Sequence, residues 1–220
     1  MTELNLTAIF DLDGTLVDSF NQILTCCQLI RKRLGMKHLD EKELKALIGL
    51  PAERLFSSNS PDITETAVIM FRNELTKEIE TGNDIFDGTE ELLKFLKSQS
   101  IKTAVATSKP HNLALKVVKN SKLDGLIDHV QGIEDFDPKP DPEVVLRCQR
   151  KLPADKFVMI GDRPEDIQAG LKSGCYTVGV AQGTFREREL KEFGAHEVFS
   201  SIECLSNEML DFLTRLENYG

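Results

Sequence analysis

Three carboxylates follow a short apolar run near the N-terminus, in the stretch I-F-D-L-D-G-T-L-V-D-S that covers residues 9–19. Side chains two apart on a strand point to the same side, so Asp11 and Asp13 would face one place. Gly14 allows a sharp turn behind them. Two carboxylates held together repel each other, and such a pair usually holds a metal ion or shares a proton. The stretch therefore predicts acid–base or metal chemistry at the end of a strand.

This stretch also has two simpler interpretations. A strand that runs into an Asp-Gly turn is common in α/β proteins and needs no chemistry. A calcium loop of the EF-hand type needs glycine at its sixth position and glutamate at its twelfth. Here the glycine is fourth and the twelfth residue is Gln22, so the calcium loop is excluded.

Polar residues also follow later apolar runs. Thr107 and Ser108 end the run 103–107, where hydroxyls and backbone N–H groups at a helix start could receive phosphate oxygens, although plain helix capping is the alternative. Lys139 stands between two prolines, which stiffen its backbone and orient its ammonium group; a solvated loop lysine is the alternative. Anion binding and these simpler roles stay open at both positions.

Two further acids follow the apolar run 157–160. Asp162 and Asp166 lie four residues apart in G-D-R-P-E-D, at a junction between a predicted strand and a predicted helix. That spacing lets both carboxylates face one site, although Asp162 could serve only as a helix cap. This junction is therefore a second place where two carboxylates could face one site.

The string D-L-D-G-T-L-V-D-S closely resembles the first motif of the haloacid dehalogenase-like (HAD) hydrolases, most of which are magnesium-dependent phosphatases. The runs A-T-S-K-P, K-P-x-P and G-D-x-x-x-D resemble the second, third and fourth motifs, in the right order along the chain. The resemblance implies that Asp11 attacks phosphorus and forms an aspartyl-phosphate. It implies that Asp13 gives a proton to the leaving alcohol and later takes one from water.

The same resemblance implies a set of binding residues. Magnesium (Mg²⁺) would be held by Asp11, by Asp162 and by the backbone carbonyl of Asp13, with Asp166 acting through a water or from behind these ligands. The phosphoryl group would be held by the Thr107 hydroxyl, the Ser108 backbone N–H and the Lys139 ammonium.

The pattern of elements predicts a fold for this site. From Asp87 onward helical and β-branched runs alternate, which favours a parallel sheet covered by helices on both faces. The expected strands are 8–10, 103–107, 129–130, 157–160, 176–180 and 197–199, and the last expected helix covers 202–216. Active sites of such sheets lie at the carboxyl ends of the strands. The fold class is thus α/β, a Rossmann-like doubly wound sheet.

Only helices are expected between residues 18 and 85, at about 20–34, 40–48 and 61–82. In the resembled family an α-helical cap domain is often inserted between the first and second motifs. We therefore expect a core domain of residues 1–17 and 86–220 and a cap domain of residues 18–85, with hinges near Asp18 and Asp87.

The substrate is less determined than the chemistry. The run G-V-A-Q-G-T-F is closest to phosphoglycolate phosphatase-like enzymes, but the family more often shows an aromatic residue near Gln182 and a proline in place of Asp87. A 5'-nucleotidase, a pyrophosphatase, a phosphomutase and a non-catalytic protein that binds a phosphorylated metabolite stay open. Residues 49–54 form the expected specificity loop of the cap. Arg54 and Arg72 are candidate anion contacts, with surface arginines as the alternative.

Composition limits the partners. The net charge is −9 without a basic block, which disfavours nucleic acid and anionic membranes, and no run could span a bilayer. We expect a cytoplasmic monomer or homodimer whose partner is a small phosphorylated metabolite. The five cysteines form no C-x-x-C pair, so free buried thiols are expected.

Overall fold

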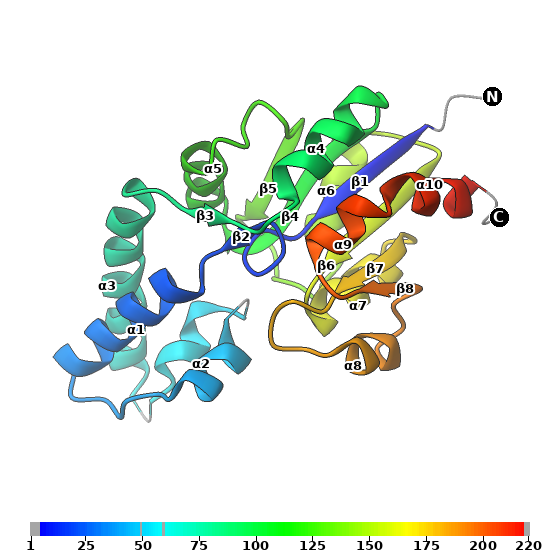
Figure 1. The fold of residues 1–220 in the computed structure, drawn as a ribbon. Coiled ribbons are helices and arrows are strands. Elements are labelled where there is room, and N and C mark those ends of the chain that lie inside the picture. Colours follow the sequence, from blue (N-terminus) through cyan, green and yellow to red (C-terminus); the bar gives the residue numbers. More distant parts are fainter. Residues whose placement is uncertain (1–4, 49, 59, 218–220) are drawn as a thin grey trace.

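The computed structural model describes residues 5–48, 50–58 and 60–217 and has the predicted α/β fold, with a parallel six-stranded sheet between layers of helices (Figure 1). The strand order is β5-β4-β1-β6-β7-β8. The strands are β1 (Leu6–Phe10), β4 (Lys102–Pro110), β5 (His129–Ile133), β6 (Lys156–Gly161), β7 (Tyr176–Val180) and β8 (Glu197–Phe199). Because β4 lies on one side of β1 and β6 on the other, the carboxyl ends of these three strands meet at one edge.

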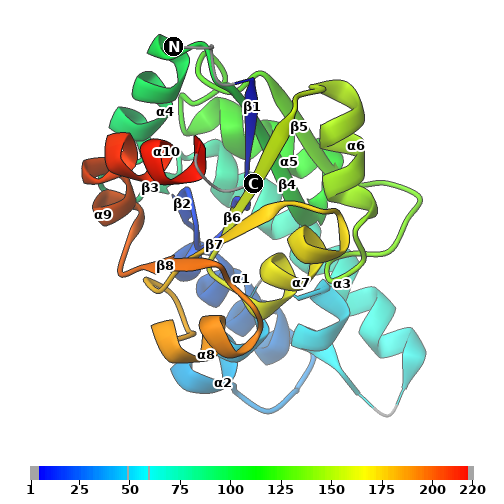
Figure 2. The same ribbon diagram turned by 90° about the vertical axis from the view of Figure 1, so that its right-hand side faces the viewer.

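Helices cover both faces of the sheet. They are α4 (Thr89–Ser98), α5 (His111–Asn120), α6 (Glu143–Lys151), α7 (Pro164–Lys172), α8 (Glu187–Glu192), α9 (Ile202–Asn207) and α10 (Met209–Glu217). Figure 2 shows α4, α9 and α10 on one side of the sheet and α6 and α7 on the other. All residues of β1 are buried: Phe10 joins the core under α4 and α5, and Ile9 joins the core under α6 and α7. The first strand is therefore central, as its apolar run predicts.

A helical segment is inserted between β1 and β4 and lies away from the sheet (Figure 1). It contains α1 (Phe20–Arg33), α2 (Glu41–Leu47), the short 3-10 helix η1 (Ala52–Phe56) and α3 (Pro61–Glu80). Asp40 caps α2, because its side chain accepts from the Glu43 N–H while the Glu43 side chain accepts from the Asp40 N–H. Apolar spacing and caps thus predicted these helices well.

The expectation of helices alone between residues 18 and 85 was wrong in one detail. The strands β2 (Val17–Asp18) and β3 (Asp84–Ile85) pair in antiparallel fashion where the segment leaves and rejoins the core. Strands of two residues are too short to show an alternating pattern, which is why the sequence did not reveal them. They bring the two connections of the inserted segment side by side.

The expectation of one last helix over 202–216 was also wrong. The chain forms α9 and α10, with Glu208 between them at φ −101° and ψ 7°. Neither proline nor glycine marks the break. Helix α9 packs against α4, and the carbonyl of Leu216 in α10 accepts from the Lys156 ammonium at 2.9 Å, so different partners hold the two helices. Tertiary packing has overridden a continuous helical pattern.

Two other expectations concern the whole chain. All five cysteines are free thiols, and four are buried as expected, whereas Cys204 is half-buried. In the part of the chain that the structure describes, no helix is long and apolar enough to cross a membrane.

Candidate active site

The site begins where β1 ends. The Asp11 N–H donates to the Ile160 carbonyl at 2.8 Å, so the pairing of β1 with β6 continues to the first acid. Gly14 follows with φ +93°, and a Cβ on this residue would lie 2.7 Å from a carboxylate oxygen of Asp162. The turn therefore needs glycine both for its backbone conformation and for the close approach of Asp162.

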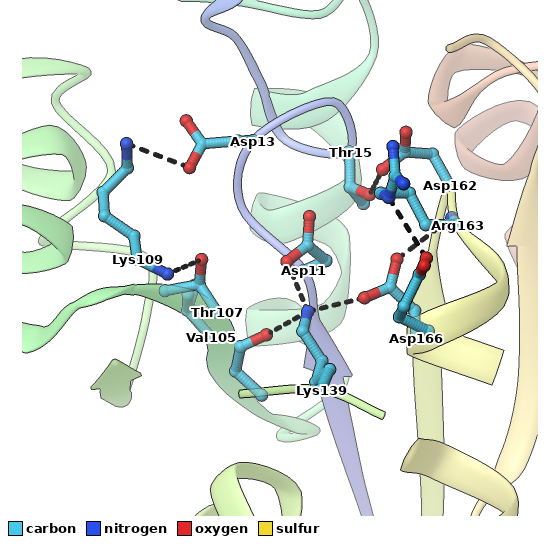
Figure 3. A network of polar contacts seen from close by, with 12 residues as sticks. Asp11, Asp13, Thr15, Val105, Thr107, Lys109, Lys139, Asp162, Arg163 and Asp166 are labelled. Atoms are coloured by element: carbon cyan, nitrogen blue, oxygen red, sulfur yellow. Dashed lines mark hydrogen bonds and ion pairs between the residues drawn. The ribbon is translucent and has the colours of Figure 1, made fainter. Parts of the chain in front are cut away.

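Lys139 lies at the centre of the site and is almost completely buried. Its ammonium lies 2.5 Å from Oδ1 of Asp11, 2.5 Å from Oδ1 of Asp166 and 2.9 Å from the Ala106 carbonyl oxygen. Figure 3 shows the lysine between the two acids. The ammonium of Lys139 points inward and its side chain is 3% exposed, so the alternative of a solvated loop lysine is excluded.

Three buried acids form a potential metal site. Asp11, Asp162 and Asp166 can each present an oxygen within 4.8 Å of the others. Oδ1 of Asp162 accepts from the Thr15 hydroxyl at 3.0 Å, and Oδ2 of Asp166 accepts from the Arg163 N–H at 3.0 Å. Oxygen ligands are those that Mg²⁺ prefers, so this donor set fits the ion. Asp166 belongs to this group of acids, and its expected role, through a water or from behind the ligands, stays a prediction.

The charges of these groups explain why a cation belongs there. Burial and, to a smaller extent, neighbouring Asp166 raise the pKa of Asp11 to about 7 despite the opposing effect of Lys139. Burial and the nearby acids raise the pKa of Asp162 well above its usual range. Burial alone would lower the pKa of Lys139, but Asp11 and Asp166 outweigh it and raise the pKa. One ammonium does not balance three carboxylates, and a divalent cation would hold them ionised.

The end of β4 supplies hydroxyls and a second lysine. Oγ1 of Thr107, which is buried, accepts from the Lys109 N–H at 3.2 Å. The Ser108 hydroxyl is buried and has no hydrogen-bond partner among the described residues. Buried hydroxyls usually have a hydrogen-bond partner, so this one is available to a ligand in the cavity that Ser108 lines.

Lys109 is a site residue that the sequence analysis missed. Its ammonium lies 3.1 Å from Oδ2 of Asp13, and both side chains are less than a tenth exposed. Oδ1 of Asp13 is buried and has no partner among the described residues. Figure 3 shows Asp13 turned toward Lys109 and away from Asp11. The alternation that pairs Asp11 with Asp13 also relates Thr107 to Lys109 and could have found this residue.

A cavity of about 280 Å³ opens above these residues. Asp11, Asp13 and residues 107–110 form one end, and side chains of the helical segment form most of the remaining wall. Arg72 is on this wall, with its guanidinium 3.3 Å from Oε1 of Glu53. Arg54 is exposed on η1 and does not line the cavity. The expected specificity loop includes Gly49, which lies outside the described residues.

Gln182 performs a role that the sequence did not reveal. Its amide nitrogen donates to the carbonyls of Gly14 at 3.0 Å and Thr15 at 2.9 Å, and its Oε1 accepts from the Ile202 N–H at 2.7 Å. The glutamine therefore ties the turn after β1 to the start of α9. This explains how the chain holds the turn without an aromatic residue at this point.

The parallel sheet, the acids at its carboxyl edge and the buried lysine together define a hydrolase site of the HAD type. The sequence profile of the haloacid dehalogenase-like hydrolases matches residues 8–180. This chain belongs to that family, as the motifs predicted.

Known relatives and a solved structure agree with this membership. A putative pyrophosphatase PpaX of Caldanaerobacter subterraneus subsp. tengcongensis is 33% identical over 80% of this chain and 82% of its own length. A 5'-nucleotidase of Pseudomonas aeruginosa is 30% identical over 83% and 86%. A phosphoglycolate phosphatase of Aquifex aeolicus is 26% identical over 93% and 98%. The crystal structure of a predicted phosphatase from Clostridium acetobutylicum has a TM-score of 0.83 and 27% identity, covering 94% of this chain and 99% of that one.

Proposed function

We propose that this HAD-family phosphatase hydrolyses a small phosphate monoester through an aspartyl-phosphate at Asp11. The observation that carries the proposal is the position of the Asp11 carboxylate. It lies at the end of the cavity, in contact with the Lys139 ammonium and beside Asp13, Thr107 and the unpartnered Ser108 hydroxyl. A nucleophile, a proton carrier and anion-binding groups thus converge on one place.

Charge is the main obstacle to this reaction. A carboxylate about 4 Å from a phosphate dianion is repelled by roughly 8 kcal/mol at an effective dielectric of 20. This repulsion would slow the attack by about six orders of magnitude. Mg²⁺, which Asp11, Asp162, Asp166 and the backbone carbonyl of Asp13 would hold, neutralises charge on the phosphoryl oxygens when bound. Lys139 adds a fixed positive charge that touches the nucleophile itself.

In the proposed reaction, different residues of the chain carry out the separate chemical steps. A carboxylate oxygen of Asp11 forms a bond to phosphorus as the bond from phosphorus to the ester oxygen breaks. Asp13 gives its proton to the leaving alcohol and next accepts one from the water that hydrolyses the acyl phosphate. The Thr107 hydroxyl, the Ser108 N–H and the Lys139 ammonium hold the phosphoryl oxygens during both steps.

The helical segment would act as a cap over this chemistry. In this proposal residues 18–85 form the cap domain and residues 1–17 and 86–220 form the core. The paired strands β2 and β3 support hinges at this place, because they gather both connections of the segment into one narrow point. A cap that closes over the cavity would exclude water until the ester is bound. The names of its relatives support a small phosphorylated metabolite as the substrate. We expect the enzyme to be a cytoplasmic monomer or homodimer.

Phosphate release from a panel of compounds tests the proposal. The panel contains phosphoglycolate, nucleoside monophosphates, sugar phosphates and pyrophosphate, each assayed with Mg²⁺ and with EDTA. We expect release from at least one monoester with Mg²⁺ and none with EDTA. Asp11→Asn should abolish turnover while its circular dichroism stays unchanged, and Asp124→Asn, an exposed matched control, should keep full activity. Turnover by Asp11→Asn would refute the mechanism, and no release from any compound of the panel would favour a binding protein.

A further inference from the structure

The wall of the cavity opposite the acids is apolar. It is formed mainly by aliphatic and aromatic side chains of α1, α2, η1, α3 and α5, including Ile23, Leu47, Leu55, Phe71, Leu75 and Leu113. Phe71 is 4% exposed, and its ring packs in a tilted arrangement, with 5.3 Å between the ring centroids, against Phe56, which is fully buried. This wall is part of the hydrophobic core and is fixed by packing. The surface that would surround a leaving group is therefore apolar before any substrate arrives.

Each basic side chain among the described residues that line the cavity already contacts an acidic side chain. Among the described lining residues the basic side chains are Lys109, which contacts Asp13 at 3.1 Å, and Arg72, which contacts Glu53 at 3.3 Å. With Asp11 and Asp13 at the acidic end and Glu53 beside Arg72, acidic side chains outnumber basic ones among the described residues that line the whole cavity. A leaving group with its own negative charge would thus meet apolar carbon and paired cations. Moving an anion out of water into such surroundings is costly.

We propose that the leaving alcohol of the natural substrate carries a compact apolar body and no second anionic group. The inference rests on the proposed phosphatase function and names the substrate class for that site. A cavity of about 150 Å³ can bind benzene, so about 280 Å³ has room for a phosphoryl group and an apolar group of similar size. Phosphoglycolate, which carries a carboxylate, and pyrophosphate, which carries a second phosphate, do not fit this chemistry.

A series of straight-chain monoalkyl phosphates tests the inference, because ethyl, butyl and hexyl phosphate have leaving groups of similar acidity. Burying a methylene group favours binding enough for roughly a fourfold gain. We expect kcat/KM with Mg²⁺ to rise about 15-fold from ethyl to butyl phosphate, and butyl phosphate to exceed phosphoglycolate and pyrophosphate. A flat or falling series, or a preference for either of the two anionic compounds, would overturn the inference.

A variant connects the preference to this wall. Leu50 lines the cavity and is only half-buried, so Leu50→Gln is compatible with folding. We expect it to lower the ratio of butyl to ethyl activity at least threefold, whereas Leu115→Gln, at an exposed position of α5, leaves the ratio unchanged. An unchanged ratio in Leu50→Gln would contradict the inference.

The two levels of the proposal fail differently. If no ester is hydrolysed, not even the activated p-nitrophenyl phosphate, the proposed function fails and this inference falls with it. If esters are hydrolysed in a Mg²⁺-dependent way but without the alkyl preference, the phosphatase mechanism stands and the inference alone is wrong.

Discussion

The contact between Lys109 and Asp13 shows how a single residue can prepare the proposed proton carrier. Both side chains are buried, so each charge depends on the other. Oδ1 of Asp13 is buried and has no partner among the described residues, although Asp13 lines the cavity. In the proposed mechanism Lys109 would act as a positioning residue that holds Oδ2 of Asp13.

Replacing this lysine should be costly. We expect Lys109→Met to lower the free energy of unfolding by about 3 kcal/mol, because it leaves the Asp13 carboxylate buried and unpaired. Activity should fall with it. In an Asp13→Asn background the same substitution should cost much less, and a double-mutant cycle by denaturant unfolding measures the difference. Lys119→Met, on the exposed face of α5, is the control. Additive effects of the two changes would show that the contact contributes little.

At the residue scale, the sequence predicted which residues belong to the site better than it predicted which side chains contact one another. Asp11, Asp162 and Lys139 all come together at the strand ends, because motif positions follow directly from strand and turn geometry. The alternation along β4 could have found Lys109, whereas no local pattern relates Gln182 to its partners. Only the completed fold shows that Gln182 bonds to the turn after β1.

At the scale of elements, the C-terminus of α2 is bound by the core. The carbonyls of the last helical turn have no partners within a helix and attract positive charge. The Arg163 guanidinium donates to the Ala46 carbonyl at 3.4 Å, and the Thr184 hydroxyl donates to the Lys45 carbonyl at 2.9 Å. The guanidinium also lies 5.1 Å from the centre of the Phe185 ring. These contacts hold the helical segment against the core beside the acid cluster.

Weakening this contact should loosen the segment. We expect Arg163→Gln to raise KM and to lower kcat/KM roughly fivefold, the effect of about 1 kcal/mol on a closing equilibrium. Proteolysis in the connections at β2 and β3 should become faster, since they would open more often. Arg188→Gln is a matched control, because this arginine is 90% exposed on α8. Unchanged kinetics and unchanged proteolysis would mean that the contact does not control the segment.

Long helices and strands with a periodic apolar pattern were predictable from the sequence, whereas very short strands and helix breaks were not. The sheet and its parallel order follow from alternating runs along the chain. The helix break at Glu208 and the pairing of β2 with β3 depend on contacts with distant elements, so no local sequence pattern indicates them. The apolar spacing on both sides of Glu208 is compatible with one helix, and packing against α4 decides otherwise.

At the scale of the whole molecule, buried thiols make stability depend on pH. Burial raises the pKa of Cys148 and of Cys175 to about 12 from an ordinary value near 9. In the unfolded chain these thiols lose their protons first, so above pH 9 the unfolded state binds fewer protons than the folded state. Stability that is complete below pH 9 is therefore lost as the pH rises toward 12.

We expect the free energy of unfolding to fall above pH 9 by up to about 1.4 kcal/mol per pH unit for each such thiol. Cys148→Ala should reduce this slope by about the contribution of one thiol. Val145→Ala creates a comparable cavity in α6 without removing a titrating group and should leave the slope as it is. Urea unfolding from pH 8 to pH 11 measures both variants. Equal slopes in the two variants would mean that Cys148 does not contribute.

The acid cluster makes a prediction for the stability of the whole fold that does not depend on turnover. Ions that bind only the folded state raise the melting temperature, and Mg²⁺ at 100 times its dissociation constant should add about 2.7 kcal/mol. For a chain of this size we expect an increase of roughly 5 to 10 °C over the value in EDTA. Differential scanning calorimetry with Mg²⁺ and with EDTA measures the increase.

The variant Asp162→Asn should separate two effects of the acid cluster: the destabilisation that its buried charge causes and the binding of Mg²⁺. Because burial and nearby acids raise the pKa of Asp162, its ionised carboxylate destabilises the metal-free fold at neutral pH. The variant removes this charge and can still accept from the Thr15 hydroxyl, so it should melt higher than the wild type in EDTA. It should also lose most of the increase with Mg²⁺, because one ligand is weakened. If Asp162→Asn keeps the full increase, the ion is bound elsewhere, and the assignment of Asp11, Asp162 and Asp166 as its ligands is wrong.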